Sequence, residues 1–440
     1  MRRLRQVLFL LGLLLSSGCL TLLFLRTTVG HELIRPIKFG KPKDTRPSPR
    51  YRPAPTYTPP PVIDPFPALA TSTPPPIPQY NVAEKDVWKK YGLEIAPPLI
   101  IGFTRSWPML LQTVVSYVTA GWPAEQIYVI ENTGMQQANA RGQLTLQHPW
   151  YLNHTSLKRL GVNVVQTPVL LSFAQLQNFY LSLSYTHNWP WYFWSHMDVL
   201  ALSHENGLDD VMPRGGEQGY KSLYMLCLEE LNRTLATDSR WGLRFFAYDH
   251  LTLQNPKAME DIGGWDTLIP YYMTDCDTYT RLHMRNWTQK DVNCGIVTDT
   301  SSTLDDLLAL YRDPNVIPSF RDPNPPPPPS EDEKQKRDDG SKDTRLVDPI
   351  EYWKKLLDVS NQMFHYKHSG RGRNTWQSGQ HGGQGELFYY DSAGFTDALD
   401  VLTQAGKEVF RRKWGHGDCN LIEGGGLKFE DQWQVLKEWE

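Results

Sequence analysis

The chain has 440 residues, of which 40% are hydrophobic and 21% are charged, and its formal charge is -3. This length allows one large domain or two ordinary ones, each with a full hydrophobic core. Basic and acidic residues are nearly balanced, 45 against 48. Proteins that bind nucleic acid usually carry a basic excess, so the composition argues against that class of partner.

The first residues predict a membrane anchor. A cluster of arginines at the N-terminus precedes a charge-free, Leu-rich run over residues 6–25. A helix over this run spans about 30 Å, the thickness of a bilayer core. The positive-inside rule then predicts a type II protein with a cytosolic tail at 1–6, a transmembrane signal anchor at 7–25 and a lumenal body. A cleaved signal peptide is the alternative, since small residues stand at 16–19.

Two segments are predicted to bury no core of their own. Residues 26–81 are rich in Pro, which favours extended polyproline II and indicates a stem. Residues 313–346 join a run of Pro to a run of charged residues and read as a disordered insertion. The structured body is therefore expected at 82–312, with a section at 347–440 that completes it.

Two further patterns fit a lumenal body. Three triplets match the acceptor pattern for N-glycans, and they begin at Asn153, Asn232 and Asn286. Four cysteines lie outside the expected anchor: Cys227, Cys276, Cys294 and Cys419. An even number permits two disulfides in three connectivities. Pairing of Cys276 with Cys294 is the first expectation, and four free thiols are the alternative.

Within the body, strand-like and helical patterns alternate. Short apolar runs predict strands at 98–103, 126–130, 162–165 and 191–194, and helical spacing predicts helices at 109–119 and 174–186. Such alternation predicts an α/β fold with a mostly parallel sheet flanked by helices. Ligands bind at the carboxyl ends of the strands in these sheets, and Glu131 and Asp198 both follow predicted strands.

The segment 98–134 resembles the opening of the nucleotide-sugar domain of GT-A glycosyltransferases, especially family 2-like enzymes. The resemblance, which covers about 98–312, implies a GT-A-like, Rossmann-related catalytic domain that takes a nucleotide-sugar donor and a glycan or glycoconjugate acceptor. In that family the acid that closes the second strand contacts the nucleoside. The resemblance thus implies donor-binding roles for four residues: Thr104, Arg105, Glu131 and Asn132.

The segment 191–199 is similar to the strand that leads into the family's metal-binding Asp-x-Asp, although His196 stands in place of the first Asp. A diphosphate leaving group needs cationic charge, and carboxylates hold Mn²⁺ or Mg²⁺. Asp198 and His196 are therefore expected metal ligands, since an i, i+2 pair on a strand shares one face. Alternatively, His196 only bonds a turn and Asp198 caps a strand end. The family often completes its metal site from a C-terminal loop, which implies His416 or Asp418 as a ligand, or else a plain surface turn there.

A later constellation joins Gly264, Trp265 and Asp266 to the acids Asp275 and Asp277. It resembles the Gly-Gly-Trp and downstream acidic motif of GT-A enzymes. The resemblance implies acceptor binding by the first three residues and a catalytic base among the two acids, with Asp275 preferred. A carboxylate can take the acceptor's proton at neutral pH. Alternatively, the two acids cap the helix that follows them.

The sequence thus predicts a membrane-anchored glycosyltransferase of the Golgi or endoplasmic reticulum, with hexosyl and N-acetylhexosaminyl transfer not distinguished. A catalytically inactive lumenal protein that binds glycans or acts as a scaffold is one alternative, which the replacement of an Asp by His196 favours. A nucleotidyltransferase is the other, but the residues after the first strand lack the glycines of a phosphate-binding loop.

Overall fold

The computed structural model describes residues 2–25, 48–51, 53, 61–321, 348–369, 382–388 and 391–436. The chain forms two units, Met1–Thr58 and Pro59–Glu440. The first contains helix α1 (Arg2–Leu25). None of the helices within the described residues is both long enough and apolar enough to cross a membrane. The expected anchor at 7–25 stays a prediction.

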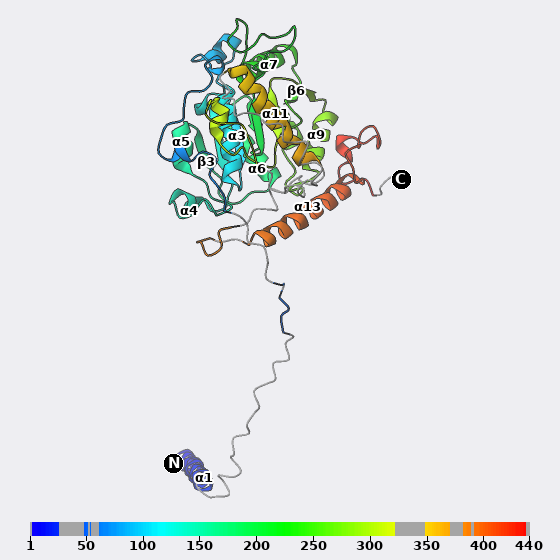
Figure 1. Ribbon diagram of the computed structural model, residues 1–440. Coiled ribbons are helices and arrows are strands. Elements are labelled where there is room, and N and C mark those ends of the chain that lie inside the picture. Colours follow the sequence, from blue (N-terminus) through cyan, green and yellow to red (C-terminus); the bar gives the residue numbers. More distant parts are fainter. Residues whose placement is uncertain are drawn as a thin grey trace, which may run out of the picture. The chain divides into compact units, whose positions relative to one another are not determined.

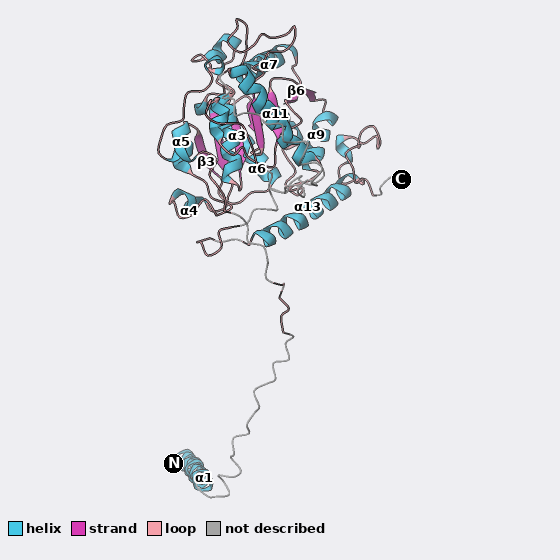
Figure 2. Cartoon of the chain, viewed as in Figure 1, coloured by secondary structure: helices cyan, strands magenta, loops and turns pink. Residues whose placement is uncertain are grey.

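The second unit is built on a seven-stranded sheet with the order β3-β2-β1-β4-β7-β6-β8 (Figure 2). Its strands are β1 (Leu99–Phe103), β2 (Ile127–Glu131), β3 (Asn163–Gln166), β4 (Tyr192–Ser195), β6 (Trp241–Phe245), β7 (Leu251–Gln254) and β8 (Thr288–Asp291). Strand β7 pairs antiparallel with both of its neighbours, and the other pairs are parallel. The predicted mostly parallel sheet and its first four strands are confirmed.

A second sheet has two strands, and the first of them directly follows β4 in the chain. Strand β5 (Val199–Leu202) pairs antiparallel with β9 (Ile296–Asp299), and Val199 lies opposite Asp299. This register brings the residue before β5 and the last residue of β9 to the same end of the pair. Asp198 and Asp299 are therefore neighbours although they are far apart in the sequence.

Helices cover both faces of the main sheet (Figure 1). Within the described residues the helices of this unit are α3 (Trp107–Thr119), α4 (Gln136–Ala140), α5 (His154–Leu160), α6 (Phe173–Thr186), α7 (Leu223–Thr237), α8 (Pro256–Ile262), α9 (Thr274–Met284), α11 (Pro349–His368) and α13 (Ser392–Trp414). Short 3₁₀ turns lie at Pro67–Ala70, Gln79–Asn81, Val87–Tyr91, Ala124–Gln126, Leu307–Tyr311 and Phe429–Asp431. The predicted helices correspond to α3 and α6.

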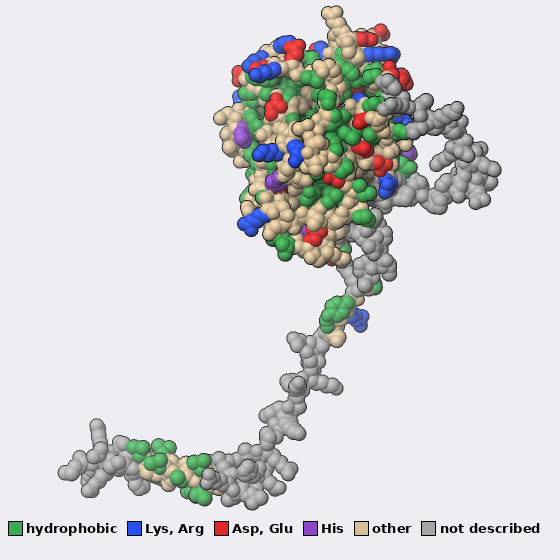
Figure 3. All heavy atoms as spheres, turned by 60° about the vertical axis from the view of Figure 1, so that its left-hand side comes forward, with side chains coloured by type: hydrophobic (Ala, Val, Ile, Leu, Met, Phe, Trp, Pro, Cys, Tyr) green, Lys and Arg blue, Asp and Glu red, His purple; other side chains and the backbone are tan. Residues whose placement is uncertain are grey.

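The alternation of side chains along the strands builds a core on each face. On β1, Leu99 and Ile101 join the core with α3, α7 and α11, whereas Ile100 points to the opposite face and packs with Leu176 and Tyr180 of α6. This is the period-2 pattern of a strand that is buried on both sides. Over the face shown in Figure 3, acidic and basic side chains are interspersed, without a surface of one sign.

The predicted stem ends earlier than 81. Phe66 and Leu69 are 2% and 1% exposed and belong to the main core. Asn81 donates to the carbonyl of Thr119 (2.9 Å) and to Glu205 Oε1 (2.9 Å). Residues 61–81 are therefore part of the folded unit. Proline content suggested a spacer, but the apolar residues between the prolines find partners.

The C-terminal section completes the same unit. Helix α11 packs on β9, where Ser360 and Thr298 share a hydrogen bond of 2.7 Å, and helix α13 lies along one side of the domain (Figure 1). A disulfide joins Cys276 of α9 to Cys419, and Cys227 and Cys294 are free and buried. The expected pairing of Cys276 with Cys294 is therefore wrong, because the tertiary fold brings a distant loop closer than the near neighbour in sequence. The predicted insertion at 313–346 lies mostly outside the described residues.

The placement of residues 61–81 can be tested by truncating Phe66, whose ring lies 5.7 Å from that of Tyr311. Phe66→Ala should lower the free energy of unfolding by about 3–5 kcal/mol, because it leaves a cavity in a packed core. Tyr51→Ala is the control, since Tyr51 is 86% exposed in the first unit, and it should change stability by less than about 0.5 kcal/mol. Urea unfolding measures the stability of both variants. Equal losses of stability in Phe66→Ala and Tyr51→Ala would mean that residues 61–81 belong to the predicted stem.

Candidate functional site

The strand order locates a crevice before any side chain is considered. From β1 the chain first builds outward through β2 and β3, and then β4 joins the opposite side of β1. At such a switch point the connections leave in opposite directions, and open α/β sheets bind ligands there, beyond the carboxyl ends of the strands. The residues after β1 and β4 begin with Thr104 and His196.

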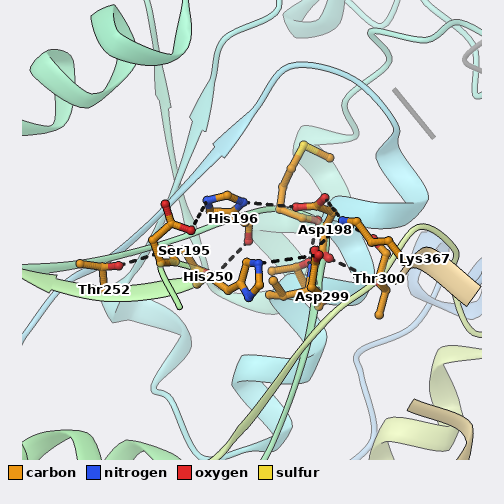
Figure 4. Close-up of polar contacts among 12 residues, drawn as sticks. Ser195, His196, Asp198, His250, Thr252, Asp299, Thr300 and Lys367 are labelled. Atoms are coloured by element: carbon orange, nitrogen blue, oxygen red, sulfur yellow. Dashed lines mark hydrogen bonds and ion pairs between the residues drawn. The ribbon is translucent and has the colours of Figure 1, made fainter. Parts of the chain in front are cut away.

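A cluster of charged side chains lies beyond β4 (Figure 4). His196 Nδ1 lies 3.7 Å from Asp198 Oδ1, and its Nε2 lies 3.7 Å from Asp249 Oδ1 in the turn between β6 and β7. His250, from the same turn, lies 3.7 Å from Asp299. Three segments that are distant in sequence thus contribute acids and imidazoles to one place.

Helix α11 supplies the cation of this cluster. Lys367 Nζ donates to Asp198 Oδ2 (2.7 Å), to Asp299 Oδ1 and to the carbonyl oxygen of Thr300 (3.1 Å). An ammonium group has three donors, so each has a partner. The next residue, His368, lies with Nε2 3.0 Å from the other oxygen of Asp299. Lys367 is 3% exposed, which makes this a buried ion pair between the last turn of α11 and the two strand ends.

The charged side chains of this cluster shift one another's pKa values. Burial favours the neutral form of His196, but its bond to Asp198 and the carboxylates of Asp249 and Asp299 outweigh burial and raise its pKa to about 9. Burial also favours the neutral forms of Asp198 and Lys367, yet their attraction lowers the pKa of Asp198 and raises that of Lys367. At neutral pH these three side chains are therefore charged. The pKa of His250 is lowered, by burial and by the charge on His196.

The metal ligands expected from the sequence do not assemble. His416 lies in the loop after α13, where its Nε2 is 2.9 Å from Asp418. Asp198 is held by Lys367, and within the described part of the chain no group of three His, Cys, Asp or Glu side chains is placed to hold a metal ion. As they stand, Asp198, His196 and His416 do not fit a divalent cation.

Glu131 is fully buried and both of its oxygens are occupied. Oε1 accepts from Asn139 (2.8 Å) and Oε2 accepts from Gln166 (2.9 Å), while His154 Nε2 lies 2.9 Å from Oε2. Burial would raise the pKa of Glu131, but these bonds lower it. Glu131 thus ties the end of β2 to α4, β3 and α5. Asn132 beside it bonds both backbone groups of Leu171.

Arg105 and Thr104 lie at the carboxyl end of β1. Arg105 is 4% exposed, and its guanidinium stacks 4.2 Å from the ring centre of Phe395 in the first turn of α13. Burial lowers its pKa to about 10, so the side chain stays charged at neutral pH. The Thr104 hydroxyl is 3.5 Å from the Asn132 amide. The two residues therefore meet the end of β2 and the start of α13.

The Gly-Gly-Trp-Asp segment is packed into the protein. Trp265 is 2% exposed and stacks edge-on with Phe173 and Tyr279, and its backbone amide and carbonyl both bond Asn178. At Gly264, whose φ is +76°, a Cβ would come within 2.7 Å of Asn178 Oδ1. Asp266 accepts from Lys413 at 2.7 Å. Trp265 offers an acceptor no surface in this conformation, and the glycine serves a close backbone approach.

The two candidate bases have different surroundings. Asp277 is fully buried, where Arg281, Lys413 and Trp414 all donate to it or pair with it. Asp275 is two residues earlier and so points to nearly the opposite side of α9; it is half-buried and accepts from the hydroxyl of Tyr248 at 3.2 Å. Only Asp275 faces the charged cluster, because the Tyr248 ring lies 5.8 Å from that of His250.

A pocket of about 460 Å³ opens beside Tyr248. It lies between the turn that joins β6 to β7 and the segment after β8, and its lining residues are Phe245, Phe246, Ala247, Tyr248, Asp291, Val292 and Asn293. Aromatic rings with a few polar groups at the edge suit the apolar face and the hydroxyls of a sugar.

The sequence alone did not indicate five members of this site: Tyr248, Asp249, His250, Asp299 and Lys367. A signal was present for Asp299, which closes the short alternating run 296–299 just as Asp198 follows β4. Lys367 lies on a helix whose apolar face packs in the core. Its role depends on the docking of that helix, which no local pattern specifies.

Comparisons with known proteins gave matches to solved structures alone. No family model and no curated protein matches the chain. A mannosyltransferase from Pyrobaculum calidifontis in complex with GDP-Man and Mn²⁺ superposes with a TM-score of 0.31 and 11% identity, covering 72% of this chain and 86% of its own. A cytidylyltransferase from Leptospira borgpetersenii serovar Hardjo-bovis gives a TM-score of 0.27 and 11% identity, covering 45% and 75%. Both likenesses are distant.

The raised pKa of His196 predicts a pH dependence of stability. The groups that face the ring are Asp198, Asp249, His250, Asp299 and Lys367. Because the folded-state pKa of about 9 exceeds the ordinary 6.5, the charged imidazole stabilises the fold fully below the ordinary value, and this contribution disappears as pH rises through the folded-state pKa.

The comparison is between the wild-type chain and His196→Gln in urea unfolding. Wild type should lose at most about 3 kcal/mol more than the variant between about pH 6 and pH 10. His283→Gln, at an exposed position on α9, should follow wild type. A variant and a wild type with parallel pH profiles would mean that His196 is not charged in the fold.

Proposed function

We propose that the protein is a glycosyltransferase that moves a sugar from a nucleotide-sugar donor to a glycan or glycoconjugate acceptor. One observation carries the proposal: the cluster of Asp198, Asp299, Lys367 and His196 stands beyond β4, beside the switch point of an open α/β sheet. Sheets of this kind bind nucleotides at that edge. The sequence resembles GT-A enzymes, and in those enzymes the donor binds at this edge of the sheet.

His196 is the cationic group that can meet the donor's diphosphate. Its pKa of about 9 keeps the ring charged at neutral pH, and its side chain is 29% exposed. Nε2 itself is buried and lies 3.7 Å from Asp249 Oδ1, so that atom faces the protein. A diphosphate beside the exposed part of the ring would instead be attracted by the charge of the imidazolium, which would stabilise the negative charge that develops as the diphosphate leaves.

Asp275 is the candidate base. Its carboxylate would take the proton of an acceptor hydroxyl while that oxygen attacks the anomeric carbon and the nucleoside diphosphate departs. The neighbouring pocket beside Tyr248 gives the acceptor a place within reach of Asp275. Asp277 is left with a structural role, because three partners already hold it in the core.

Two features support a place in the lumen of the secretory pathway, in the Golgi or the endoplasmic reticulum. The disulfide between Cys276 and Cys419 needs an oxidising compartment. Asn232 and Asn286, which begin two of the glycan acceptor triplets, are exposed. The proposal of a lumenal enzyme rests on these features and not on a membrane span.

Donor binding can be measured by calorimetry with nucleoside diphosphates and nucleotide sugars. One base class should bind, and at a ligand concentration of 100 times Kd it should stabilise the fold by about 2.7 kcal/mol. His196→Gln should weaken binding about tenfold, because it removes a positive charge beside the diphosphate. The exposed His283→Gln is the matched control and should bind as wild type does. Absence of binding by every nucleotide would leave the glycan-binding or scaffold protein as the better assignment.

The role of Asp275 as the base can be tested separately by measuring sugar transfer. Asp275→Asn should reduce sugar transfer, measured by mass spectrometry of the product, by about 10²–10⁴-fold, the usual range for a positioned general base. Nucleotide affinity should stay unchanged, because Asp275 contacts the acceptor side. Asp209→Asn, at an exposed site, serves as the control. Full activity of Asp275→Asn would assign the base elsewhere.

A further inference from the structure

Lys367 lies in a pocket made of oxygen atoms. Around its Nζ stand one oxygen from Asp198, one from Asp299 and the carbonyl oxygen of Thr300. Carboxylate and carbonyl oxygens are the ligands that Mg²⁺, Mn²⁺ and Ca²⁺ take in proteins. The ammonium group therefore occupies a position with the donor set of a hard divalent cation.

We propose that the Lys367 ammonium takes the place of a divalent cation in this site, so that nucleotide binding needs no metal and removal of Lys367 creates a metal site. The first part deepens the proposed function and rests on it. The second part concerns the chain alone and can be tested without any nucleotide. Lys367 is a positioning residue here, since its three donors are all used by the protein.

The helix delivers the ammonium in a fixed position. Met363 and Leu356 of α11 are fully buried in the main core, and the indole of Trp353 donates to the carbonyl of Ser203 at 3.0 Å. The Ser360 hydroxyl bonds Thr298, one residue before Asp299. With the helix anchored along its length, Lys367 does not have to be ordered when a ligand binds.

An added metal ion and Lys367 exclude each other. A cation bound to the same oxygens of Asp198 and Asp299 would stand within about 3–4 Å of the ammonium, and like charges at that distance repel strongly when screened little by water. Lys367 is 3% exposed, so water does not screen it well. The ion would have to displace the side chain from an anchored helix.

Removing the ammonium leaves three oxygen ligands without a cation. The two carboxylates and the Thr300 carbonyl would keep their places, and Mg²⁺ or Mn²⁺ can be held by one or two carboxylates with water completing the coordination. Two imidazoles stand on the far side of Asp299, at its other oxygen: His368 Nε2 at 3.0 Å and His250 Nε2 at 3.7 Å. In Figure 4, His250 and Lys367 approach Asp299 from opposite sides, so Asp299 lies between the imidazole and the vacated position.

The first measurement titrates Mn²⁺ into the full chain without nucleotide and follows free Mn²⁺ by electron paramagnetic resonance. Wild type should bind no Mn²⁺ at this cluster, and Lys367→Ala should bind one equivalent that Asp299→Asn in the same background weakens about 10–100-fold. Uptake by wild type that Asp299→Asn removes would overturn the proposal. Lack of uptake by a folded Lys367→Ala chain would also overturn it.

Lys413→Ala is the matched control. Lys413 is 2% exposed and bridges two aspartates, Asp266 and Asp277, at 2.7 Å each. Arg281 and Trp414 surround Asp277, so the vacated position would have cationic and apolar neighbours where the Lys367 site has imidazoles. This variant should bind no Mn²⁺. Equal uptake by both variants would show that any unpaired buried carboxylates take the ion, which would overturn the specific role of Lys367.

The second measurement repeats the nucleotide calorimetry on wild type in the presence of chelator. Affinity should be the same, within about twofold, with chelator and with Mn²⁺. Binding that requires Mn²⁺ would overturn the proposal even if the Lys367→Ala chain failed to fold. If no nucleotide binds under either condition, the proposed function fails, and the Mn²⁺ titration still decides the role of Lys367.

Discussion

The ion pairs of Lys367 with Asp198 and Asp299 are the interaction on which the site depends. Two carboxylates at adjacent strand ends are buried together, and an uncompensated buried charge costs several kcal/mol. The antiparallel register of β5 and β9 creates this problem, since it sets Val199 opposite Asp299. A buried cation resolves it, and α11 must dock with its last turn at this point to provide one. The C-terminal section is thereby an obligatory part of the domain.

A second pair of acids also needs a cation to balance its charge. Asp277 and Asp266 are held by Lys413 near the end of α13, while the first turn of that helix covers Arg105 with Phe395. Helix α13 therefore contacts the carboxyl end of β1 and the outer helix α9 through opposite ends. Two helices from the last quarter of the chain, α11 and α13, each use a lysine to satisfy a pair of acids contributed by earlier segments.

Local patterns predicted the first half of the sheet well. The strands β1 to β4 and the helices α3 and α6 could be predicted from apolar runs and helical spacing. Each of them packs in the core, so its own residues carry the pattern of a buried strand or helix. The antiparallel insertion of β7 between β4 and β6 was not predictable, since pairing partners are chosen by tertiary contacts. Proline content concealed the folded segment 61–81 for a related reason: two apolar residues, Phe66 and Leu69, fix it to the core.

Strand-end reasoning found Asp198 and His196, which do belong to the charged cluster. It could not find Lys367, which is 169 residues from Asp198 in sequence. For Asp277 and Trp265 the motif suggested roles in the site, but the sequence did not show that both side chains are buried. An Asp in the first turn of a helix looks the same whether it faces solvent, as a base must, or faces Arg281 and Lys413 inside the core. Only the packing distinguishes these cases.

The disulfide between Cys276 and Cys419 has a consequence for the integrity of this arrangement. It closes a covalent loop with a sequence separation of 143 residues, and both Asp299 and Lys367 lie inside that loop. A protease that cut the chain once between 321 and 348 would therefore leave α11 tethered to the sheet. The helix would return to its position from a high effective concentration, as a linked binding module does. The nicked protein would separate into two fragments only after reduction.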